Sequence, residues 1–233
     1  MPHTCQLHPS GTSLRVGTIY CIGRNYARHI EELGNVANET PVVFLKPASA
    51  LLDDGGTIVL PHFSASVHHE VEVVVLIGTG GRNIPRERAL DHVGGWGIGL
   101  DLTARDVQDE LKKKGLPWTI SKGFDTSACI STFVDRGEAD DPASFEFHLD
   151  VNGERRQQGS TAMMLFPVPV LIEYLSSMFT LEAGDLIYTG TPEGVAALTP
   201  GDRLDLVLAN MTRAAFTVAG SETLGTTQSA GAA

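Results

Sequence analysis

The segment Val67–Ile77 constrains the fold more than any other part of this chain. It reads VHHEVEVVVLI, and Gly78 follows it. A short Val-rich run of this kind is typical of a strand buried on both faces of a sheet. Residues i and i+2 of a strand share a face, so Glu70 and Glu72 point the same way. Two carboxylates at the edge of a core repel each other and require a cation, a proton or basic neighbours.

A third acid, Asp101, lies in a similar setting. It ends the apolar segment GIGL and directly precedes an expected helix start at Thr103. Hard cations such as Mg2+ take carboxylates together with waters and substrate oxygens. Glu70, Glu72 and Asp101 are therefore candidate metal ligands. The alternative is that the glutamates lie on the solvated face of an amphipathic strand and that Asp101 is a turn or cap residue.

The segment RNYARHIEE contains a candidate general base. On a helix, His29 and Glu32 are i,i+3 neighbours on one face. A carboxylate beside an imidazole fixes its tautomer and raises its basicity, which suits the removal of a proton from water near neutral pH. A surface histidine on a charged helix is the simpler alternative.

Three further positions carry groups that suit an anionic ligand. Lys46 and Lys122 are lone cations in apolar surroundings. In a pocket they would bind an anion or stabilise developing negative charge, but either could equally extend to solvent. Thr191 belongs to the segment TGTPEG, whose backbone N–H groups could receive a carboxylate and which could also be a plain turn.

Secondary-structure patterns predict an α+β, β-dominated fold. Strands are expected at 17–22, 41–45, 57–60, 71–77, 97–102, 145–151, 185–188 and 203–208. Asn152-Gly153 predicts a two-residue hairpin turn. Helices are expected at 26–33, from Thr103 to about Lys114, and at 169–178, with Thr103 and Asp106 as a capping pair and Gly115 as the stop signal.

The domain organisation is simple. A chain of 233 residues with 42% hydrophobic residues can bury one large core, and no linker-like change of composition interrupts it. We expect an N-terminal extension at 1–16, a single catalytic domain at 17–218 and a flexible C-terminal tail at 219–233. The tail segment has one Leu and no aromatic residue, too little apolar surface to repay its ordering.

Composition excludes several function classes. A net charge of -11 argues against nucleic-acid and anionic-membrane partners. The three cysteines are far apart, no apolar run reaches about 20 residues, and the first residues lack a signal-peptide pattern, so we expect a cytoplasmic protein. The motifs of phosphate-binding loops, dinucleotide folds, zincins and serine hydrolases are missing.

Several segments, in their order along the chain, resemble the fumarylacetoacetate hydrolase family, in particular its short single-domain acylpyruvate hydrolase-like branch. They are CIGRNYARHIEE, VVFLKP, VHHEVEVVVLIG, GLDLTARDVQDELKKKGLPWTISKGFD, VNGERRQQGST and GDLIYTGTPEGV. The resemblance implies a mixed β-roll around a Mg2+ or Mn2+ site, usually in a homodimer. It places the metal carboxylates at Glu70, Glu72 and Asp101.

The same resemblance implies roles for other residues. It makes His29 and Glu32 a catalytic dyad on a lid that orders when ligand binds, and Lys122 the catalytic-site lysine. Arg24, Lys46, Gln108 and Thr191 match substrate-binding positions more loosely.

The function expected from these residues is metal-dependent hydrolysis of the C3–C4 bond of an acylpyruvate, a 2,4-dioxo acid such as fumarylpyruvate, to pyruvate and a carboxylic acid. Two alternatives remain open. The same site could decarboxylate oxaloacetate or tautomerise a 2-oxo acid, or the chain could be a non-catalytic metal-binding member. In each catalytic case the partner is a small anionic 2-oxo acid.

Overall fold

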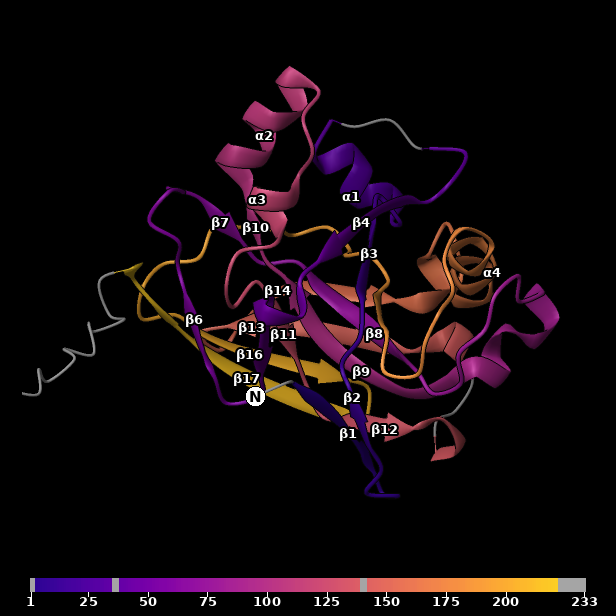
Figure 1. The fold of residues 1–233 in the computed structure, drawn as a ribbon. Coiled ribbons are helices and arrows are strands. Elements are labelled where there is room, and N and C mark those ends of the chain that lie inside the picture. Colours follow the sequence, from indigo (N-terminus) through magenta and orange to yellow (C-terminus); the bar gives the residue numbers. More distant parts are fainter. Residues whose placement is uncertain (1–2, 35–37, 139–141, 222–233) are drawn as a thin grey trace, which may run out of the picture.

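Two packed β-sheets form the body of the molecule, as the computed structural model shows (Figure 1); it describes residues 3–34, 38–138 and 142–221. The larger sheet contains β2 (Ser13–Arg15), β1 (Thr4–His8), β12 (Phe133–Asp135), β9 (Val93–Asp101), β8 (Val71–Ile77), β15 (Leu186–Tyr188), β3 (Ile19–Gly23) and β4 (Val42–Lys46), in that order, with β11 (Ala128–Ile130) joining β9 to β5 (Leu51–Asp53). The smaller sheet has the order β14 (Glu154–Ser160), β13 (Glu146–Val151), β16 (Arg203–Leu208), β17 (Thr212–Ala219) and β6 (Thr57–Val59). The expected β-dominated fold is confirmed.

Helices lie around these sheets. They are α1 (Ala27–Glu32), α2 (Arg105–Lys114), α3 (Thr119–Lys122) and α4 (Val168–Met178), with short 3-10 helices at η1 (Ala48–Ala50), η2 (Arg86–His92), η3 (Arg136–Glu138), η4 (Pro142–Ser144) and η5 (Thr161–Met163). In Figure 1, α1, α2 and α3 gather at the top of the view, and α4 lies to the right of the sheets. A small ladder of β7 (Val67–His68) with β10 (Thr103–Ala104) lies below α2.

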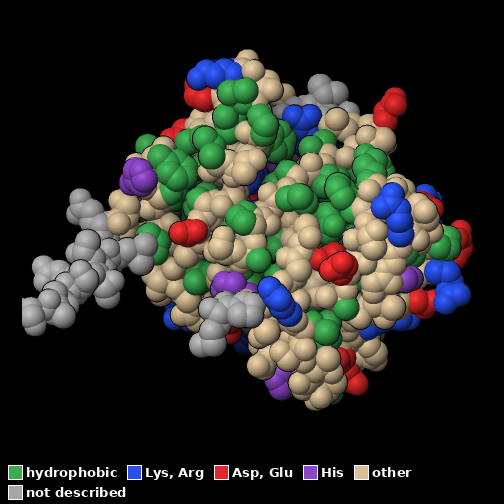
Figure 2. All heavy atoms as spheres, in the orientation of Figure 1, with side chains coloured by type: hydrophobic (Ala, Val, Ile, Leu, Met, Phe, Trp, Pro, Cys, Tyr) green, Lys and Arg blue, Asp and Glu red, His purple; other side chains and the backbone are tan. Residues whose placement is uncertain are grey.

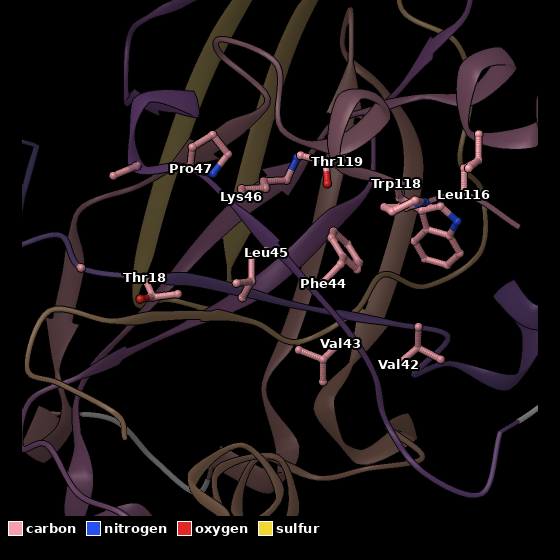
Figure 3. A pocket seen from close by; sticks show the side chains of 13 residues that line it. Thr18, Val42, Val43, Phe44, Leu45, Lys46, Pro47, Leu116, Trp118 and Thr119 are labelled. Atoms are coloured by element: carbon pink, nitrogen blue, oxygen red, sulfur yellow. The ribbon is translucent and has the colours of Figure 1, made fainter. Parts of the chain in front are cut away.

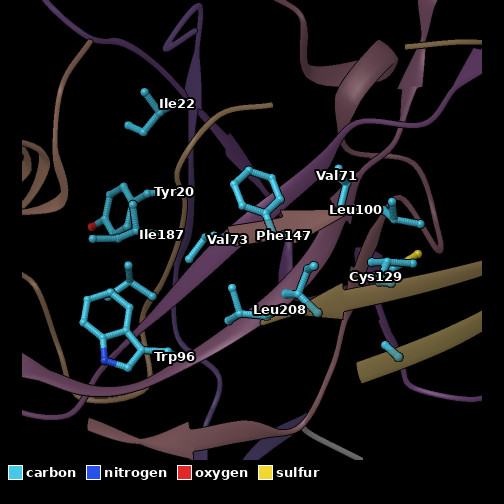
Figure 4. Close-up of a cluster of buried hydrophobic side chains, with 14 of the residues drawn as sticks. Tyr20, Ile22, Val71, Val73, Trp96, Leu100, Cys129, Phe147, Ile187 and Leu208 are labelled. Carbon is cyan, nitrogen blue, oxygen red and sulfur yellow. The ribbon is translucent and has the colours of Figure 1, made fainter. Parts of the chain in front are cut away.

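The central strand β8 is buried along its whole length, as its sequence predicts. It pairs antiparallel with β9 on one side and with β15 on the other. Val73 and Val75 face the core shared with the smaller sheet, whereas Val74 and Leu76 face a second apolar cluster on the opposite side. Figure 4 shows the first of these cores, where residues of both sheets meet.

Strand β9 begins at Val93, four residues before the predicted strand, because a glycine-rich segment is recruited into the sheet. Glycine weakens a strand when it leaves space unfilled. Here the neighbours fill that space, since a Cβ on Gly97 would lie 2.9 Å from the Phe133 ring and one on Gly99 would lie 2.3 Å from the Cys129 carbonyl oxygen. Tertiary packing therefore overrides the local propensity.

Turn and helix-end signals were mostly correct. Asn152 and Gly153 both adopt positive φ in the tight turn between β13 and β14, and Gly115 ends α2 in the left-handed conformation. The predicted Thr103–Asp106 capping pair is wrong, because Thr103 is drawn into β10 and α2 begins after Ala104 without a side-chain cap. Asp106 instead accepts hydrogen bonds from the hydroxyl of Ser64 at 2.6 Å and the N–H of Ala65 at 2.8 Å.

The sequence predicts a separate segment at each end of the central domain. The segment expected as an N-terminal extension contributes β1 and β2, and β1 pairs in parallel with β12 of the larger sheet. Residues 222–233 of the predicted flexible tail lie outside the described residues, and β17 ends at Ala219. The domain limits themselves stay predictions.

Candidate metal centre and catalytic site

Three acids meet where β8 begins and β9 ends. Glu70 directly precedes β8, Glu72 is its second residue and Asp101 is the last residue of β9. Antiparallel pairing sets Glu72 opposite Gly99, two residues before Asp101, and the Asp101 N–H donates to the Glu70 carbonyl at 2.9 Å. One carboxylate oxygen from each acid lies within 4.8 Å of the others, and all three residues are buried. The strand pairing thus assembles the oxygen cluster that the sequence predicted.

Three cations contact two of these three acids, Glu70 and Asp101. Lys122 Nζ lies 2.7 Å from both Glu70 Oε2 and Asp101 Oδ2, and Lys46 Nζ lies 2.9 Å from Asp101 Oδ1. The Arg105 guanidinium donates to Glu70 Oε1. Burial alone would raise the pKa of Glu70, but Lys122 and Arg105 hold it well below its usual range. Burial alone would lower the pKa of Lys122, and the two carboxylates raise it instead.

Glu72 is the acid that these cations leave uncompensated. Among the described residues, no cation lies within ion-pair distance of its carboxylate. Its Oε2 accepts a 2.7 Å hydrogen bond from the Gly190 N–H. Burial, and then the charges of Asp101 and Glu70, raise the pKa of Glu72 well above its usual value. A buried set of carboxylate oxygens in which one carboxylate has no cation in contact fits a hard divalent cation such as Mg2+ or Mn2+.

The predicted dyad is formed by the short helix α1. His29 Nδ1 lies 3.3 Å from Glu32 Oε2, and the Glu32 carboxylate also accepts hydrogen bonds from the Gly194 N–H at 3.0 and 3.2 Å. Burial lowers the pKa of His29, while Glu70 and Glu32 oppose that shift. His29 is therefore neutral at neutral pH and can accept a proton.

A small cavity of about 40 Å³, which we call the metal cavity, lies between the dyad and the acids. Its walls include most of the predicted site residues, namely Arg24, His29, Glu70, Glu72, Gln108, Lys122 and Thr191. Asp101 and Glu32 contact this set without lining the cavity. Residues from six separate segments of the sequence therefore meet around one space.

Lys46 lies next to Asp101, and its predicted substrate-binding role stays a prediction. Its ammonium is fully buried and hydrogen-bonds to the carbonyls of Leu102 and Lys122 and to the hydroxyl of Ser127, as well as pairing with Asp101. It does not line the cavity with Glu70 and Glu72. These contacts favour the interpretation that Lys46 positions Asp101.

Outside the metal cavity, a wider apolar groove follows β4. Its volume is about 820 Å³, and residues 116–119 form its other wall (Figure 3). Phe44 and Trp118 point toward one another there, with ring centroids 5.8 Å apart, and both also line the metal cavity. Figure 2 shows apolar side chains gathered on the face between α2 and the centre of the view.

Sequence reasoning missed two residues that organise the site. Arg105 lies four residues after Asp101 and holds Glu70 and Gln108 together, donating to Gln108 Oε1 at 2.6 Å. The isolated arginine at the start of a predicted helix was the available signal. Gln157 accepts from the Val71 N–H at 3.1 Å and donates to the Thr191 hydroxyl at 2.9 Å, and no local pattern could have indicated this role.

Asn25 connects the start of α1 to the loop that supports Glu72. Its side-chain N–H2 donates to the Thr189 carbonyl at 2.7 Å, and its Oδ1 accepts from the Phe166 N–H at 2.7 Å. Gly190 follows Thr189 with φ of +100°, and a Cβ there would lie 2.6 Å from the Asn25 Cβ. Glycine is required at this position both for its conformation and for the close approach.

Comparisons with known proteins agree with this architecture. The family model described as fumarylacetoacetate (FAA) hydrolase C-terminal matches residues 18–219. The chain is 46% identical over 200 residues to "Oxaloacetate tautomerase FAHD1, mitochondrial" of Arabidopsis thaliana and 44% identical over 200 residues to the protein of that name in Homo sapiens, covering 86% of this chain and 90% of each relative. A crystal structure of fumarylpyruvate hydrolase from Pseudomonas aeruginosa, in complex with Mn2+ and pyruvate, superposes with a TM-score of 0.89 at 37% identity, covering 94% of this chain and 96% of that one.

The buried oxygen cluster and the two-sheet fold define a family of enzymes with hydrolase, isomerase and tautomerase members. This chain belongs to the fumarylacetoacetate hydrolase family.

Within the described residues, no helix combines the length and apolar character needed to cross a membrane. The tautomerase relatives carry the word mitochondrial in their names, so the cytoplasmic location expected from the sequence stays a prediction.

Proposed function

We propose that this chain is a divalent-metal-dependent enzyme of small 2-oxo acids and that its main reaction is the keto–enol tautomerisation of oxaloacetate. The observation that carries the proposal is the buried His29 in the same cavity as the carboxylate cluster, with burial lowering the pKa of its imidazole. The names of relatives at 44–46% identity favour this reaction over the others that such a site supports.

The chain's own groups would move the protons, and a bound metal would supply the polarisation of the substrate. When bound at Glu70, Glu72 and Asp101, Mg2+ or Mn2+ would act as a Lewis acid on the 2-oxo group and make the C3 protons more acidic. His29 would take a proton from C3, and Glu32 would stabilise the imidazolium that results. A proton returned to the C2 oxygen completes the enol, and the reverse sequence gives the keto form. Lys122 contributes positive charge beside the reacting oxygens.

Hydrolysis of an acylpyruvate is the second candidate, because the His29–Glu32 pair can also activate water. His29 would deprotonate a water, and the hydroxide formed would attack C4. Lys122 would stabilise the alkoxide, and cleavage of the C3–C4 bond would leave its electron pair on C3, which His29 then protonates. The products are pyruvate and a carboxylic acid. The structural relative in complex with Mn2+ and pyruvate favours this alternative.

Kinetics of the 233-residue chain with Mg2+ separate these reactions. Enol-oxaloacetate ketonisation, oxaloacetate decarboxylation, and hydrolysis of acetylpyruvate and fumarylpyruvate are compared by kcat/KM. We expect tautomerisation to be fastest and a chelator to abolish it. A larger kcat/KM for an acylpyruvate would favour the hydrolase, and one for decarboxylation would favour the decarboxylase. Absence of all turnover would favour a non-catalytic metal-binding protein.

Replacement of the base tests the mechanism. We expect His29→Ala to lower both tautomerisation and hydrolysis by about 10²–10⁴-fold, the usual contribution of a positioned acid–base group. His62→Ala is the matched control, because His62 is exposed and does not line the cavity. Unchanged tautomerisation in His29→Ala would refute the role given to this residue.

We also propose a homodimer as the assembly and Mg2+ or Mn2+ as the ion. Light scattering coupled to size-exclusion chromatography tests the first, and titration of the metal-free protein with each ion tests the second. A monomer in solution, or an absence of binding, would reject the respective proposal.

A further inference from the structure

The helix α2 presents one side of its surface to the metal cavity. Arg105, Gln108 and Lys112 recur at the spacing that brings helical residues onto one face, and all three line the cavity. The next two lysines, Lys113 and Lys114, have side chains that are 71% and 64% exposed and lie beside Glu110. Lys112 is only 27% exposed, so it differs from its neighbours in facing inward.

The Lys112 ammonium lies against the cavity wall rather than in open solvent. Its Nζ is 5.7 Å from the centre of the Trp118 ring, and Trp118 lines the same cavity. Burial, and then the positive charge of Arg105, lower the pKa of Lys112. The nearest carboxylate oxygen that pairs with it, Asp109 Oδ1, is 3.8 Å away, a distance longer than a hydrogen bond.

The other cations of the site are already engaged, and Arg24, which also lines the cavity, donates to Asn38 Oδ1 at 3.0 Å. Lys122 contacts both Glu70 and Asp101, and Arg105 donates to Glu70 and to Gln108. Lys112 is a cavity-lining cation with no ion pair to any of the three candidate metal ligands among the described residues. Its charge is therefore available to a group that enters the cavity.

The balance of charge indicates what that group would be. The formal charges of the three acids and of Lys46, Arg105 and Lys122 sum to zero, although none of these cations contacts Glu72. A divalent ion would leave these groups with two positive charges. Arg24 and Lys112 also line the cavity and raise the total to four, and Glu32 beside His29 lowers it to three. A monoanion would neutralise only one of these charges, whereas a dianion would neutralise two. Buried charge is costly unless it is paired, so the site favours a substrate with two carboxylates.

We propose that Lys112 binds the distal carboxylate of a dicarboxylic 2-oxo acid, and that it selects such substrates over monocarboxylic 2-oxo acids of the same length. The inference rests on the proposed function for the identity of the 2-oxo acid end. It adds a specificity-determining residue, Lys112, to that function.

A matched pair of ligands isolates the distal carboxylate. Oxaloacetate and 2-oxobutyrate share the carboxylate and the 2-oxo group and differ in having a carboxylate or a methyl group at the far end. Binding of each to the Mg2+-loaded protein is measured by calorimetry, and the oxaloacetate tautomerisation KM is measured alongside. The variants are Lys112→Met, Lys112→Arg and, as a control on the same helix, Lys113→Met.

We expect Lys112→Met to weaken oxaloacetate binding and raise its KM by about tenfold or more, the value of a hydrogen bond between charged groups. Binding of 2-oxobutyrate should change by less than about threefold, as for a charge that makes no direct contact. Lys112→Arg should retain most of the affinity for oxaloacetate, and Lys113→Met should match the wild type.

Three results would overturn the proposal. They are an equal loss for both ligands in Lys112→Met, unchanged binding of both, or the same loss in Lys113→Met. Circular dichroism and the retained binding of 2-oxobutyrate show whether the Lys112→Met variant is folded. If that variant is unfolded, Lys112→Arg still tests whether a positive charge at this position is needed. A wild type that binds oxaloacetate through Lys112 but turns nothing over would refute the proposed function and leave this inference standing.

Discussion

The charged groups at the junction of β8 and β9 and those on the outer face of α2 are chemically alike, but their environments are opposite. Asp101 has a side chain that is 2% exposed and contacts two lysines, whereas Glu110 is 57% exposed and also lies beside two lysines. Water and salt screen the second group, so its ion pairs contribute little. The first group is held in a medium of low polarity, where each charge depends on its partners. The same residue types thus form a buried candidate site in one place and a solvated surface in the other.

The largest expected effect comes from removing one buried charge. Asp101→Asn leaves Lys46 and Lys122 without their shared partner, so we expect a loss of about 3–5 kcal/mol in the free energy of unfolding of the metal-free protein. It should also reduce kcat by at least about 10²–10³-fold, as when a preorganised charge is lost. Urea unfolding of the metal-free protein measures the first quantity, and steady-state kinetics with Mg2+ measure the second. The control Asp109→Asn on α2 should change stability by less than about 0.5 kcal/mol, and equal effects of the two variants would remove the distinction between the regions.

A second prediction concerns the backbone that supports Glu72, where Gly190 is crowded by Asn25. Gly190→Ala places a Cβ 2.6 Å from the Asn25 Cβ at a φ of +100°, so overpacking and backbone strain should together cost about 2–4 kcal/mol. Gly201 has a similar φ of +96° but nothing within 4 Å of its Cβ position, so Gly201→Ala should cost only about 1 kcal/mol of strain. Thermal and urea unfolding compare them. Equal costs would show that crowding at Asn25 is unimportant.

The His29–Glu32 dyad is less buried than Asp101 and less exposed than Glu110. We expect it to make both stability and activity depend on pH. Burial lowers the pKa of His29 and of His69 below the usual 6.5, so the folded state favours their neutral forms. The unfolded chain binds these protons more readily than the folded state does. The contribution of the two histidines to the free energy of unfolding is therefore fully present above about pH 6.5 and is lost as the pH falls below that value. Urea midpoints at pH 7.5 and 5.5 should differ less in His29→Gln than in the wild type. The acid limb of kcat/KM should also fall below 6.5, and a limb above that value would contradict a lowered pKa.

The smallest effect is expected on the outer face of α2. Glu110 is within 3.0 Å of Lys113 and 3.8 Å of Lys114, yet both lysines are largely exposed. Glu110→Gln should leave the urea midpoint and kcat/KM unchanged within error. A clear loss of stability would mean that the surface pairs matter more than their exposure indicates.

Local patterns predicted those parts of the fold that depend on neighbouring residues. The apolar run of β8 and the Asn152-Gly153 turn were evident because backbone conformation and side-chain alternation are local properties. The capping pair at Thr103 failed because a cross-strand partner at His68 competes for that residue. The start of β9 was missed because its glycines are stabilised by aromatic rings and carbonyls that are distant in sequence.

The candidate site divides in the same way. The spacing of Glu70 and Glu72 and of His29 and Glu32 follows from one strand and one helix, so each pair was visible in the sequence. The places of Lys46 and Gln157 were not visible, because their partners lie 55 or more residues away: Lys46 pairs with Asp101 and Gln157 holds Val71.

The sequence by itself determined which side chains could take part in chemistry and which family the chain belongs to, because both follow from residue types and their order along the chain. Only the tertiary structure decided which cation balances which acid, and which cation remains available to a ligand. That choice depends on distances and burial between segments far apart in the chain, because the energy of a charge depends on the medium and the partners around it.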